Sequence, residues 1–310
     1  MKLDFPLDLS IESVDYCNYT CPYCPRAENQ GSKDRISKDA FMSVIDEFSE
    51  KTGGLGAVGF DRGEPLIDRH LEDKVRYIDD RGIADIIVTT NGVFLTADRS
   101  RRLIEAGLTK LHISLDAATQ ETYTKTRGGN LALVEKNVHD FLRIREERRA
   151  RIPIVRVSFV VCELNEHEIP LFEAKWAHLV EYVEFQDCVD FSRVDALEDY
   201  PVEPFWCHYP FQQVVVTAGG ELRPCCSFYN KHLIFGRLEN GDTIERVFNC
   251  SQNEQLRQSF LQKKDYALVC KNCRCAPPAG SGIRANSLLK PAARPAKGAA
   301  SPPIEGLFQS

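Results

Sequence analysis

Residues 9–24, LSIESVDYCNYTCPYC, place three cysteines directly after a short apolar run. The run Leu9–Val14 has the length and composition of a buried strand. Cys17, Cys21 and Cys24 follow it with C-x3-C-x2-C spacing. Three thiolates on one loop can hold three corners of a [4Fe–4S] cluster, which leaves the fourth iron without a protein ligand. Such an open metal position is typical of catalytic sites; a structural zinc or a loop of buried thiols is the alternative.

Short apolar runs and longer amphipathic segments alternate from this stretch to about residue 190. The expected strands are Leu9–Val14, Ala57–Phe60, Ile86–Thr89, Leu111–Leu115, Val155–Val161 and Tyr182–Phe185. The expected helices are Lys38–Lys51, Asp68–Arg81, Asp98–Ala106 and Leu133–Arg148, which carry apolar residues at three- and four-residue spacings. This alternation predicts an α/β fold with a parallel sheet, either open or curved into a partial barrel. Chemistry is then expected at the carboxyl ends of the strands.

Composition and charge exclude several classes of protein. The chain has 310 residues, with 39 Lys and Arg against 45 Asp and Glu, a net charge of −6. An acidic chain lacks the broad basic surface that binds a phosphate backbone. No run reaches the ~20 apolar residues of a membrane-spanning helix, and the first residues lack a signal-peptide pattern. We therefore expect a cytoplasmic protein whose 12 cysteines are not disulfides.

The pattern changes near residue 190. After a proline-containing linker, a strand is expected over Phe211–Thr217, followed by the turn Ala218-Gly219-Gly220 and a return strand near Leu222. Helices are expected to begin near Thr243 and Asn253. The final stretch is rich in Pro, Ala, Gly and Ser, a composition that cannot bury a core. We expect an α/β domain over residues 1–195, a small α+β domain over 196–276 and a disordered tail over 277–310.

A second group of four cysteines lies in the smaller domain. Its members are Cys207, Cys225, Cys270 and Cys273. Two distant thiols plus a close Cys-x2-Cys pair, expected on a loop, suit a four-thiolate zinc site or a fully ligated iron–sulfur cluster. Cys226 could replace its neighbour Cys225, and Cys275 could replace Cys273. We prefer Cys225, because it stands four residues after Gly220 in a hairpin pattern.

The first cysteine group and the segments after it resemble the radical S-adenosylmethionine (SAM) enzymes over about residues 8–276. Tyr23 stands just before the third cysteine, as in that family. Further matches follow in order: Asp61-Arg62-Gly63-Glu64-Pro65-Leu66, Thr90-Asn91-Gly92, Ser114-Leu115-Asp116 and Thr126-Arg127-Gly128. Arg62 occupies a position where the family usually has glycine. The resemblance implies a partial (β/α)6 TIM-like barrel.

The same motifs supply residues suited to a cofactor. Cys17, Cys21 and Cys24 are the expected metal ligands, and Tyr23, Gly63, Glu64, Asn91, Ser114, Asp116 and Arg127 are the expected SAM contacts. Gly63 permits close backbone approach, and Glu64 can accept a hydrogen bond from the SAM amine. Arg127 can bind the SAM carboxylate with two N–H groups. Ser114 and Asp116 suit the ribose hydroxyls.

The second cysteine group resembles the C-terminal SPASM and twitch extensions of that family. The likeness covers the Cys-x12-Gly-x4-Cys hairpin through Gly220, the segment Phe235–Leu238 and the closing Cys-x2-Cys pair. The longer SPASM pattern continues with more cysteines, whereas this chain offers only Cys275. The resemblance therefore implies one auxiliary [4Fe–4S] cluster, held by Cys207, Cys225, Cys270 and Cys273.

An activity follows from the resemblance. It implies an oxidoreductase that uses SAM with two [4Fe–4S] clusters, one catalytic and one auxiliary. Reductive cleavage of SAM gives a 5′-deoxyadenosyl radical, which removes a hydrogen atom from the substrate, and the auxiliary cluster then takes an electron. A reductant such as flavodoxin or ferredoxin is the expected partner, with no membrane and no nucleic acid.

The substrate and the outcome stay open at this point. Because the first strand begins near Leu9, we expect no leader-binding domain, which favours a sugar, an aminocyclitol or a similar small molecule over a peptide. Strand alternation points to Ser158, Gln186 and Asp187 as substrate contacts. Cys188 could instead return a hydrogen atom and give redox-neutral epimerisation. The further alternatives are an RNA substrate bound at residues 143–151 and a zinc-binding scaffold without activity.

Overall fold

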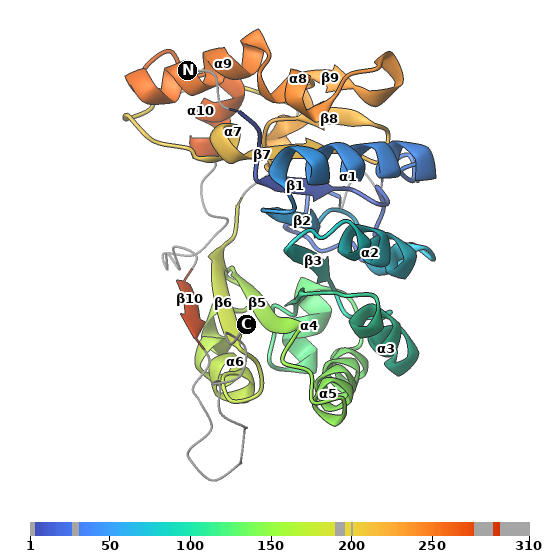
Figure 1. Cartoon of the computed structure of the whole chain (residues 1–310). Helices are drawn as coiled ribbons and strands as arrows, with labels where there is room; N and C mark the ends of the chain where they lie inside the picture. The colour runs from blue at the N-terminus through green and yellow to red at the C-terminus, as the bar shows by residue number, and fades with distance from the viewer. Residues whose placement is uncertain (1–3, 27–30, 190–195, 200, 276–287, 292–310) are drawn as a thin grey trace.

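Ten strands of the described chain form one continuous sheet (Figure 1). The computed structural model describes residues 4–26, 31–189, 196–199, 201–275 and 288–291. The strand order is β10-β6-β5-β4-β3-β2-β1-β7-β8-β9. Strands β1 to β6 are parallel and lie in chain order, so the structure confirms the expected α/β fold with a parallel sheet.

The larger part of the sheet alternates with helices along the chain. Its strands are β1 (Asp8–Ile11), β2 (Ala57–Phe60), β3 (Asp85–Thr90), β4 (Lys110–Ser114), β5 (Ile154–Val161) and β6 (Tyr182–Asp187). Its helices are α1 (Lys38–Thr52), α2 (Leu71–Asp80), α3 (Ala97–Glu105), α4 (Gln120–Thr126), α5 (Leu131–Glu147) and α6 (Ile169–Trp176), with 3-10 turns η1 (Pro65–Ile67) and η2 (Glu166–Glu168). All six expected strands and four expected helices are present, whereas the short helices α4 and α6 are additional.

The second part extends the same sheet and gathers its helices at one end of the molecule (Figure 1). It contains α7 (Tyr209–Gln212), β7 (Gln213–Val216), β8 (Glu221–Arg223), η3 (Phe228–His232), β9 (Gly236–Arg237), η4 (Leu238–Asn240), α8 (Ile244–Phe248), α9 (Ser251–Gln262) and α10 (Leu268–Cys275). The last described strand, β10 (Leu288–Pro291), lies at the opposite edge of the sheet, beside β6. Strand β7 pairs in parallel with β1, with Leu9 opposite Val214, and β8 returns antiparallel to β7.

Three expectations for this second part need correction. The strand expected from Phe211 starts only at Gln213, because Pro210 opens the short helix α7. The Cys-x2-Cys pair lies on helix α10 rather than on a loop. Within the expected tail, Leu288–Pro291 forms β10 antiparallel to β6, and the rest of the tail falls outside the described residues.

The strands are apolar and buried on the face that packs against the helices, and the other face carries a mixture of polar and apolar residues. Leu9, Val58, Ile86, Leu111, Val155 and Val183 are all at most 2% exposed and belong to one core with the helices. The alternate residues toward the carboxyl ends include Ser10, Thr89 and Ser114. This two-residue period turns polar side chains toward the concave interior, where a site can form.

Side-chain caps fix where the helices begin. Ser37, Thr96, Thr119 and Asn130 each accept a hydrogen bond from a backbone N–H in the first turn of the helix that follows, at 3.1–3.4 Å. These caps hold the helices that connect neighbouring strands. No helix of the described residues has the length and apolarity to cross a membrane.

We predict that the central strand β1 is sensitive to loss of side-chain volume. Leu9→Ala should lower the free energy of unfolding by about 2–5 kcal/mol, because the cavity left between sheet and helices cannot close fully. Leu171→Ala, at a 52% exposed position on α6, should change it by less than about 0.5 kcal/mol. Anaerobic denaturant unfolding measures both, and equal effects would contradict the placement of β1 at the centre of the core.

Candidate active site

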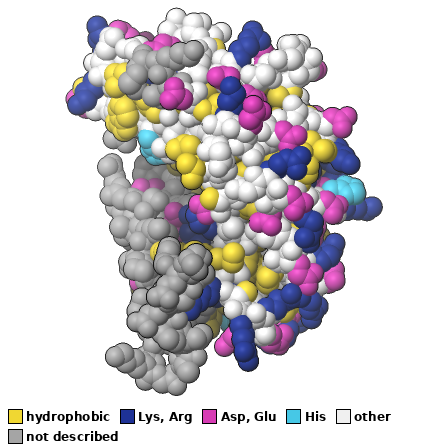
Figure 2. Space-filling view, in the orientation of Figure 1, with side chains coloured by type: hydrophobic (Ala, Val, Ile, Leu, Met, Phe, Trp, Pro, Cys, Tyr) yellow, Lys and Arg dark blue, Asp and Glu magenta, His cyan; other side chains and the backbone are white. Residues whose placement is uncertain are grey.

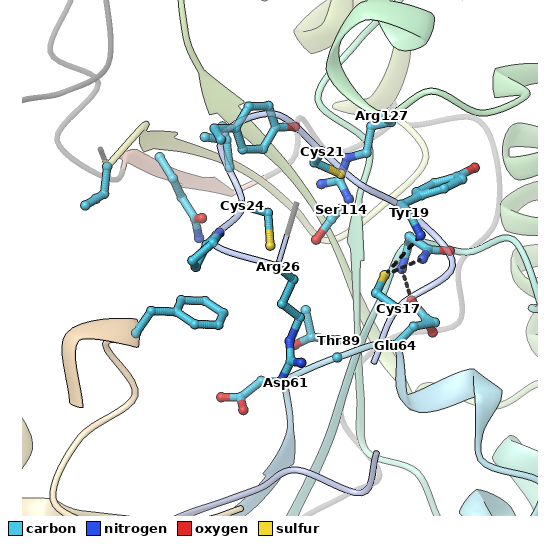
Figure 3. Close-up of a pocket in the computed structure, with 18 of the residues that line it drawn as sticks. Cys17, Tyr19, Cys21, Cys24, Arg26, Asp61, Glu64, Thr89, Ser114 and Arg127 are labelled. Carbon is cyan, nitrogen blue, oxygen red and sulfur yellow. Dashed lines mark hydrogen bonds between the residues drawn. The ribbon is translucent and has the colours of Figure 1, made fainter. Parts of the chain in front are cut away.

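The loop after β1 carries three thiols into one cavity. Cys17, Cys21 and Cys24 line a cavity of about 370 Å³ together with residues from the carboxyl ends of neighbouring strands. Figure 3 shows the three sulfur atoms on a single loop, with Asp61, Glu64 and other side chains around the same space. The predicted cysteine group is therefore brought together at the expected edge of the sheet.

Backbone and side-chain contacts hold this loop. The Tyr19 N–H lies 3.4 Å from the Cys17 sulfur, and the Asn91 side-chain amide lies 3.7 Å from it. The Cys24 N–H donates to the Cys21 carbonyl at 2.9 Å. Burial raises the pKa of Cys21 to about 11 and also raises the pKa of Cys17. Because only the thiolate binds metal, metal binding must overcome this penalty.

The Gly63-Glu64 segment packs directly against the cysteine loop. Gly63 has φ +62°, and a Cβ there would lie 2.3 Å from the Val14 carbonyl oxygen. The Glu64 N–H donates to the Tyr16 carbonyl at 2.9 Å. This close approach needs glycine, as the motif predicts.

The Glu64 carboxylate is buried but keeps acceptor capacity. Its Oε1 accepts from Thr90 Oγ1 at 2.6 Å and from the Leu66 N–H at 2.9 Å, and its Oε2 accepts from the Asn91 N–H at 2.8 Å. Burial raises the pKa of Glu64, while these donors lower it. A carboxylate has about four lone-pair sites, so one is left at Oε2 for a donor in the cavity.

Asp116 occupies a different place from the one expected. Its side chain is fully buried and is not part of the cavity lining; Oδ2 accepts from Tyr23 and Arg127, and Oδ1 accepts from the Val160 N–H at 2.7 Å. The expected contact with ribose is therefore replaced by a positioning role for two cavity residues. Removing Asp116 would leave buried Arg127 unpaired, at a cost of about 3–5 kcal/mol.

Arg127 and Tyr23 are held by that carboxylate while they line the cavity. Burial opposes the charge of Arg127, but Asp116 and Tyr23 raise its pKa well above the usual value, so it remains a cation. Within the described residues its buried Nε has no hydrogen-bond partner. Burial and the neighbouring Asp116 raise the pKa of Tyr23, which stays neutral.

The remaining predicted residues divide into two sets. Asn91 and Ser114 line the cavity, as do Gln186, Asp187 and Cys188 at the end of β6. Ser158 does not line it; its hydroxyl lies 3.5 Å from that of Ser114. Cys188 is only 1% exposed, so its thiol is shielded from bulk solvent.

Arg26, Asp61 and Phe228 are among the cavity residues that were not predicted from the sequence. Arg26 follows the cysteine loop and pairs with Glu12. Asp61 opens on the cavity, where burial raises its pKa while Ser10 and Arg62 lower it. Strand alternation from Ala57 through Gly59 would have found Asp61. Phe228 comes from the smaller domain, and no local sequence pattern predicts that it lines this cavity.

The second cysteine group lines a separate cavity of about 200 Å³. Cys207, Cys225, Cys270 and Cys273 all face it, among aromatic and aliphatic side chains that include Phe205, Trp206, Tyr229 and Phe260. Cys226 is not part of this lining; its thiol shares a hydrogen bond with Tyr209 and interacts with Asp61. This geometry favours Cys225 over Cys226 as a ligand, while the Cys275 side chain lies outside the described residues.

The donor sets fit iron–sulfur clusters better than single ions. Among the described residues, no three Cys, His, Asp or Glu side chains converge closely enough to hold one metal ion. A [4Fe–4S] cluster binds each thiolate through a separate iron, so it needs the wider spacing of thiols around a cavity. Three thiols with open space beside them suit the first site, and four thiols around one cavity suit the second.

Three of the five arginines in residues 143–151 form ion pairs. Arg143 pairs with Glu147 at 2.6 Å and with Asp140 at 3.1 Å, Arg145 pairs with Glu181 at 2.9 Å, and Arg148 pairs with Glu105. Figure 2 shows basic and acidic side chains interspersed on the visible face. This pairing disfavours the RNA alternative, because a phosphate backbone needs uncompensated cations.

Comparison with protein families identifies both parts of the chain. Residues 11–170 match the radical SAM superfamily, and residues 207–274 match SPASM, an iron–sulfur cluster-binding domain. A probable GTP 3′,8-cyclase of Saccharolobus islandicus is 28% identical over 199 residues, 63% of this chain and 58% of the relative. A GTP 3′,8-cyclase of Limosilactobacillus fermentum is 40% identical over 126 residues, 39% and 37% of the two chains. The chain thus spans less than two thirds of either relative.

Solved structures share the fold at low identity. BtrN in complex with AdoMet and 2-DOIA aligns with a TM-score of 0.61 and 19% identity, over 93% of this chain and all of BtrN. The enzyme anSMEcpe with AdoMet and a peptide aligns at 0.63 and 16%, over 90% and 91%. Streptococcus suis SuiB bound to its precursor peptide SuiA aligns at 0.64 and 14%, over 90% and 75%. These likenesses establish the barrel fold.

We predict that Gly63→Ala disrupts the first site selectively. The added Cβ would meet the Val14 and Tyr16 carbonyl oxygens at 2.3 and 2.8 Å, so the cysteine loop must shift. Anaerobically reconstituted protein should fall from about eight to about four irons per chain and lose SAM binding. Gly82→Ala is the matched control, with φ +71° but nothing within 4 Å of the added Cβ; it should retain all its iron.

The two adjacent cysteines of the second site give a sharper comparison. Cys225→Ala should lose about four irons per chain and the signal of one cluster, because it removes a thiol from the cavity wall. Cys226→Ala should keep the full iron content, measured by iron analysis and electron paramagnetic resonance (EPR). The reverse pattern would make Cys226 the ligand.

Proposed function

Because the chain belongs to the radical SAM superfamily and is a radical SAM enzyme with [4Fe–4S] clusters, we propose that it oxidises a small molecule bound between its two thiol groups. The observation that carries this proposal is the shared wall of the first cavity. Phe228, three residues after Cys225, lines that cavity together with Cys17, Cys21 and Cys24. A substrate in this cavity would lie between a radical source and an electron acceptor.

The chain's own residues would hold the cofactors as follows. Cys17, Cys21 and Cys24 would bind the catalytic cluster, and Cys207, Cys225, Cys270 and Cys273 the auxiliary one. Glu64 Oε2 and Arg127 Nε would meet the SAM amine and carboxylate, and Ser114, Asn91 and Tyr23 would border the nucleoside. When bound, these cofactors supply hydrogen-atom abstraction and a one-electron acceptor. A reductant such as flavodoxin or ferredoxin would provide the initiating electron.

Asp61 is suited to accept the proton that oxidation of an alcohol releases. Its Oδ1 accepts from Ser10 Oγ at 2.5 Å, which leaves Oδ2 for a substrate hydroxyl, and the side chain borders the cavity. Conversion of an alcohol to a ketone removes a hydrogen atom from carbon, a proton from oxygen and one electron. Burial raises the pKa of Asp61, which improves it as a base.

Polar side chains in the cavity lining support a sugar, an aminocyclitol or a similar compound. Gln186 and Asp187 offer hydrogen-bonding groups for hydroxyl or ammonium substituents. The two described arginines of the lining, Arg26 and Arg127, are each paired with a carboxylate. A nucleoside triphosphate, the substrate named for the GTP cyclases, would need more free positive charge. A peptide is the second candidate, as anSMEcpe and SuiB are solved with peptides.

In the redox-neutral alternative, which is epimerisation, Cys188 would be the hydrogen-atom donor. Its thiol borders the cavity and is shielded from bulk solvent, so it could return a hydrogen atom to a substrate radical. Cys188 would then end as a thiyl radical, which an external electron and proton must restore. The auxiliary thiol group makes oxidation the preferred outcome.

Two substitutions separate these outcomes. With a panel of sugars and aminocyclitols, wild-type protein should form a product two hydrogen atoms lighter than its substrate. Asp61→Asn should lower the ratio of product to 5′-deoxyadenosine by about 10²–10⁴-fold, the range expected for loss of a general base. Cys188→Ala should leave this ratio unchanged.

Mass spectrometry of product and 5′-deoxyadenosine in the same reaction gives the ratio. A product of unchanged mass that disappears in Cys188→Ala would replace oxidation with epimerisation. A wild-type ratio of product to 5′-deoxyadenosine in Asp61→Asn would show that Asp61 is not the base.

A further inference from the structure

Arg62 joins the strand-end motif of the barrel to the loop that carries an auxiliary-site thiol. It is 5% exposed, and its Nη2 donates to the Cys226 carbonyl at 2.7 Å and to the Ser227 carbonyl at 3.2 Å. Its guanidinium carbon also lies 5.0 Å from the centre of the Phe228 ring. One buried cation therefore contacts three consecutive residues after Cys225.

That loop is closely tied to the auxiliary thiols. The Cys225 carbonyl accepts a hydrogen bond from the Asn230 side chain, and the Ser227 hydroxyl lies 3.4 Å from the Cys273 sulfur. Arg62 holds the next two carbonyls of the same loop. The position of Cys225 in its cavity and of Phe228 in the other cavity thus depends on one set of hydrogen bonds.

The residues that follow Arg62 contact the loop of the first thiol group. Arg62 is directly followed by Gly63 and Glu64, which pack on the Val14 and Tyr16 carbonyls just before Cys17. Residues 62–64 therefore contact both cysteine loops. Glycine at position 62 could not make this connection, because it has no side chain to reach the smaller domain.

The positive charge of Arg62 also affects a cluster bound nearby. Arg62 is a buried cation next to the backbone of a cysteine loop, and its Nε has no hydrogen-bond partner among the described residues. A positive charge in a low-dielectric region stabilises the reduced, more negative state of a nearby iron–sulfur cluster. Asp61 also lies near this loop, but it accepts a hydrogen bond from Ser10 and faces the cavity.

We propose that Arg62 is a positioning residue for the auxiliary cluster site, which fixes the loop Cys225–Phe228 and raises the reduction potential of the auxiliary cluster. The proposal rests on the ligand set of the proposed function and is independent of the substrate. It gives Arg62 a role at the auxiliary site although the residue belongs to a motif of the first site.

Redox titration monitored by EPR tests this role in the reconstituted full chain. Arg62→Gln and Arg62→Met should shift the midpoint potential of the auxiliary cluster to more negative values and alter its EPR signal, with the first cluster unchanged. Arg62→Lys keeps the charge and a donor for both carbonyls, so it should restore the potential toward that of the wild type. Arg69→Gln removes an exposed arginine of the same segment and should change neither cluster.

The other results of this experiment either support or overturn the proposed role of Arg62. Selective loss of the auxiliary cluster in the uncharged variants, with rescue by lysine, also supports the proposal. Uncharged variants with full iron and a wild-type potential and signal would overturn it. Loss of both clusters together in the uncharged variants would show a purely structural residue and overturn it as well. A wild-type chain with only one cluster would instead refute the ligand set of the proposed function.

Discussion

The parallel pairing of β7 with β1 is the contact on which the arrangement of both thiol groups depends. Strand β1 lies between β2 and β7 in the sheet, and the loop after it carries Cys17, Cys21 and Cys24. The same pairing attaches the smaller domain, and the loop Cys225–Phe228 after β8 brings Phe228 to the wall of the first cavity. Arg62, just after β2, donates a hydrogen bond to this loop. Under the proposed function, the two clusters can therefore act on one bound molecule.

The two described arginines that line the first cavity are each paired with a carboxylate. Asp116 neutralises Arg127 and positions Tyr23, and Glu12 neutralises Arg26. Burial raises the pKa of several thiols, and at Cys21 it outweighs the opposite effect of the nearby Arg127 cation. Metal binding is the compensation that fits these sites, because it stabilises the thiolate directly. The fold and its cofactors are then expected to stabilise each other.

Local patterns in the sequence predicted the parallel sheet well, and tertiary placement explains what they missed. Buried strands such as Val155–Val161, in which five of the seven residues are apolar, are visible without the structure. Helix α4 has only seven residues and too few turns to show a period. The Cys-x3-Cys-x2-Cys loop was predictable because its ligands are local. The burial of Asp116 and the arrival of Phe228 depend on contacts between distant segments, which spacing does not record.

The central claim is that the three thiols after β1 hold a cluster whose fourth iron accepts SAM. Its most direct test is the formation of 5′-deoxyadenosine when anaerobically reconstituted protein is mixed with dithionite and SAM, without substrate. We expect 5′-deoxyadenosine from the wild type and none after replacement of Cys17, Cys21 and Cys24 by alanine. Wild-type protein with a full iron content that forms no 5′-deoxyadenosine, even after addition of cell extract, would contradict it.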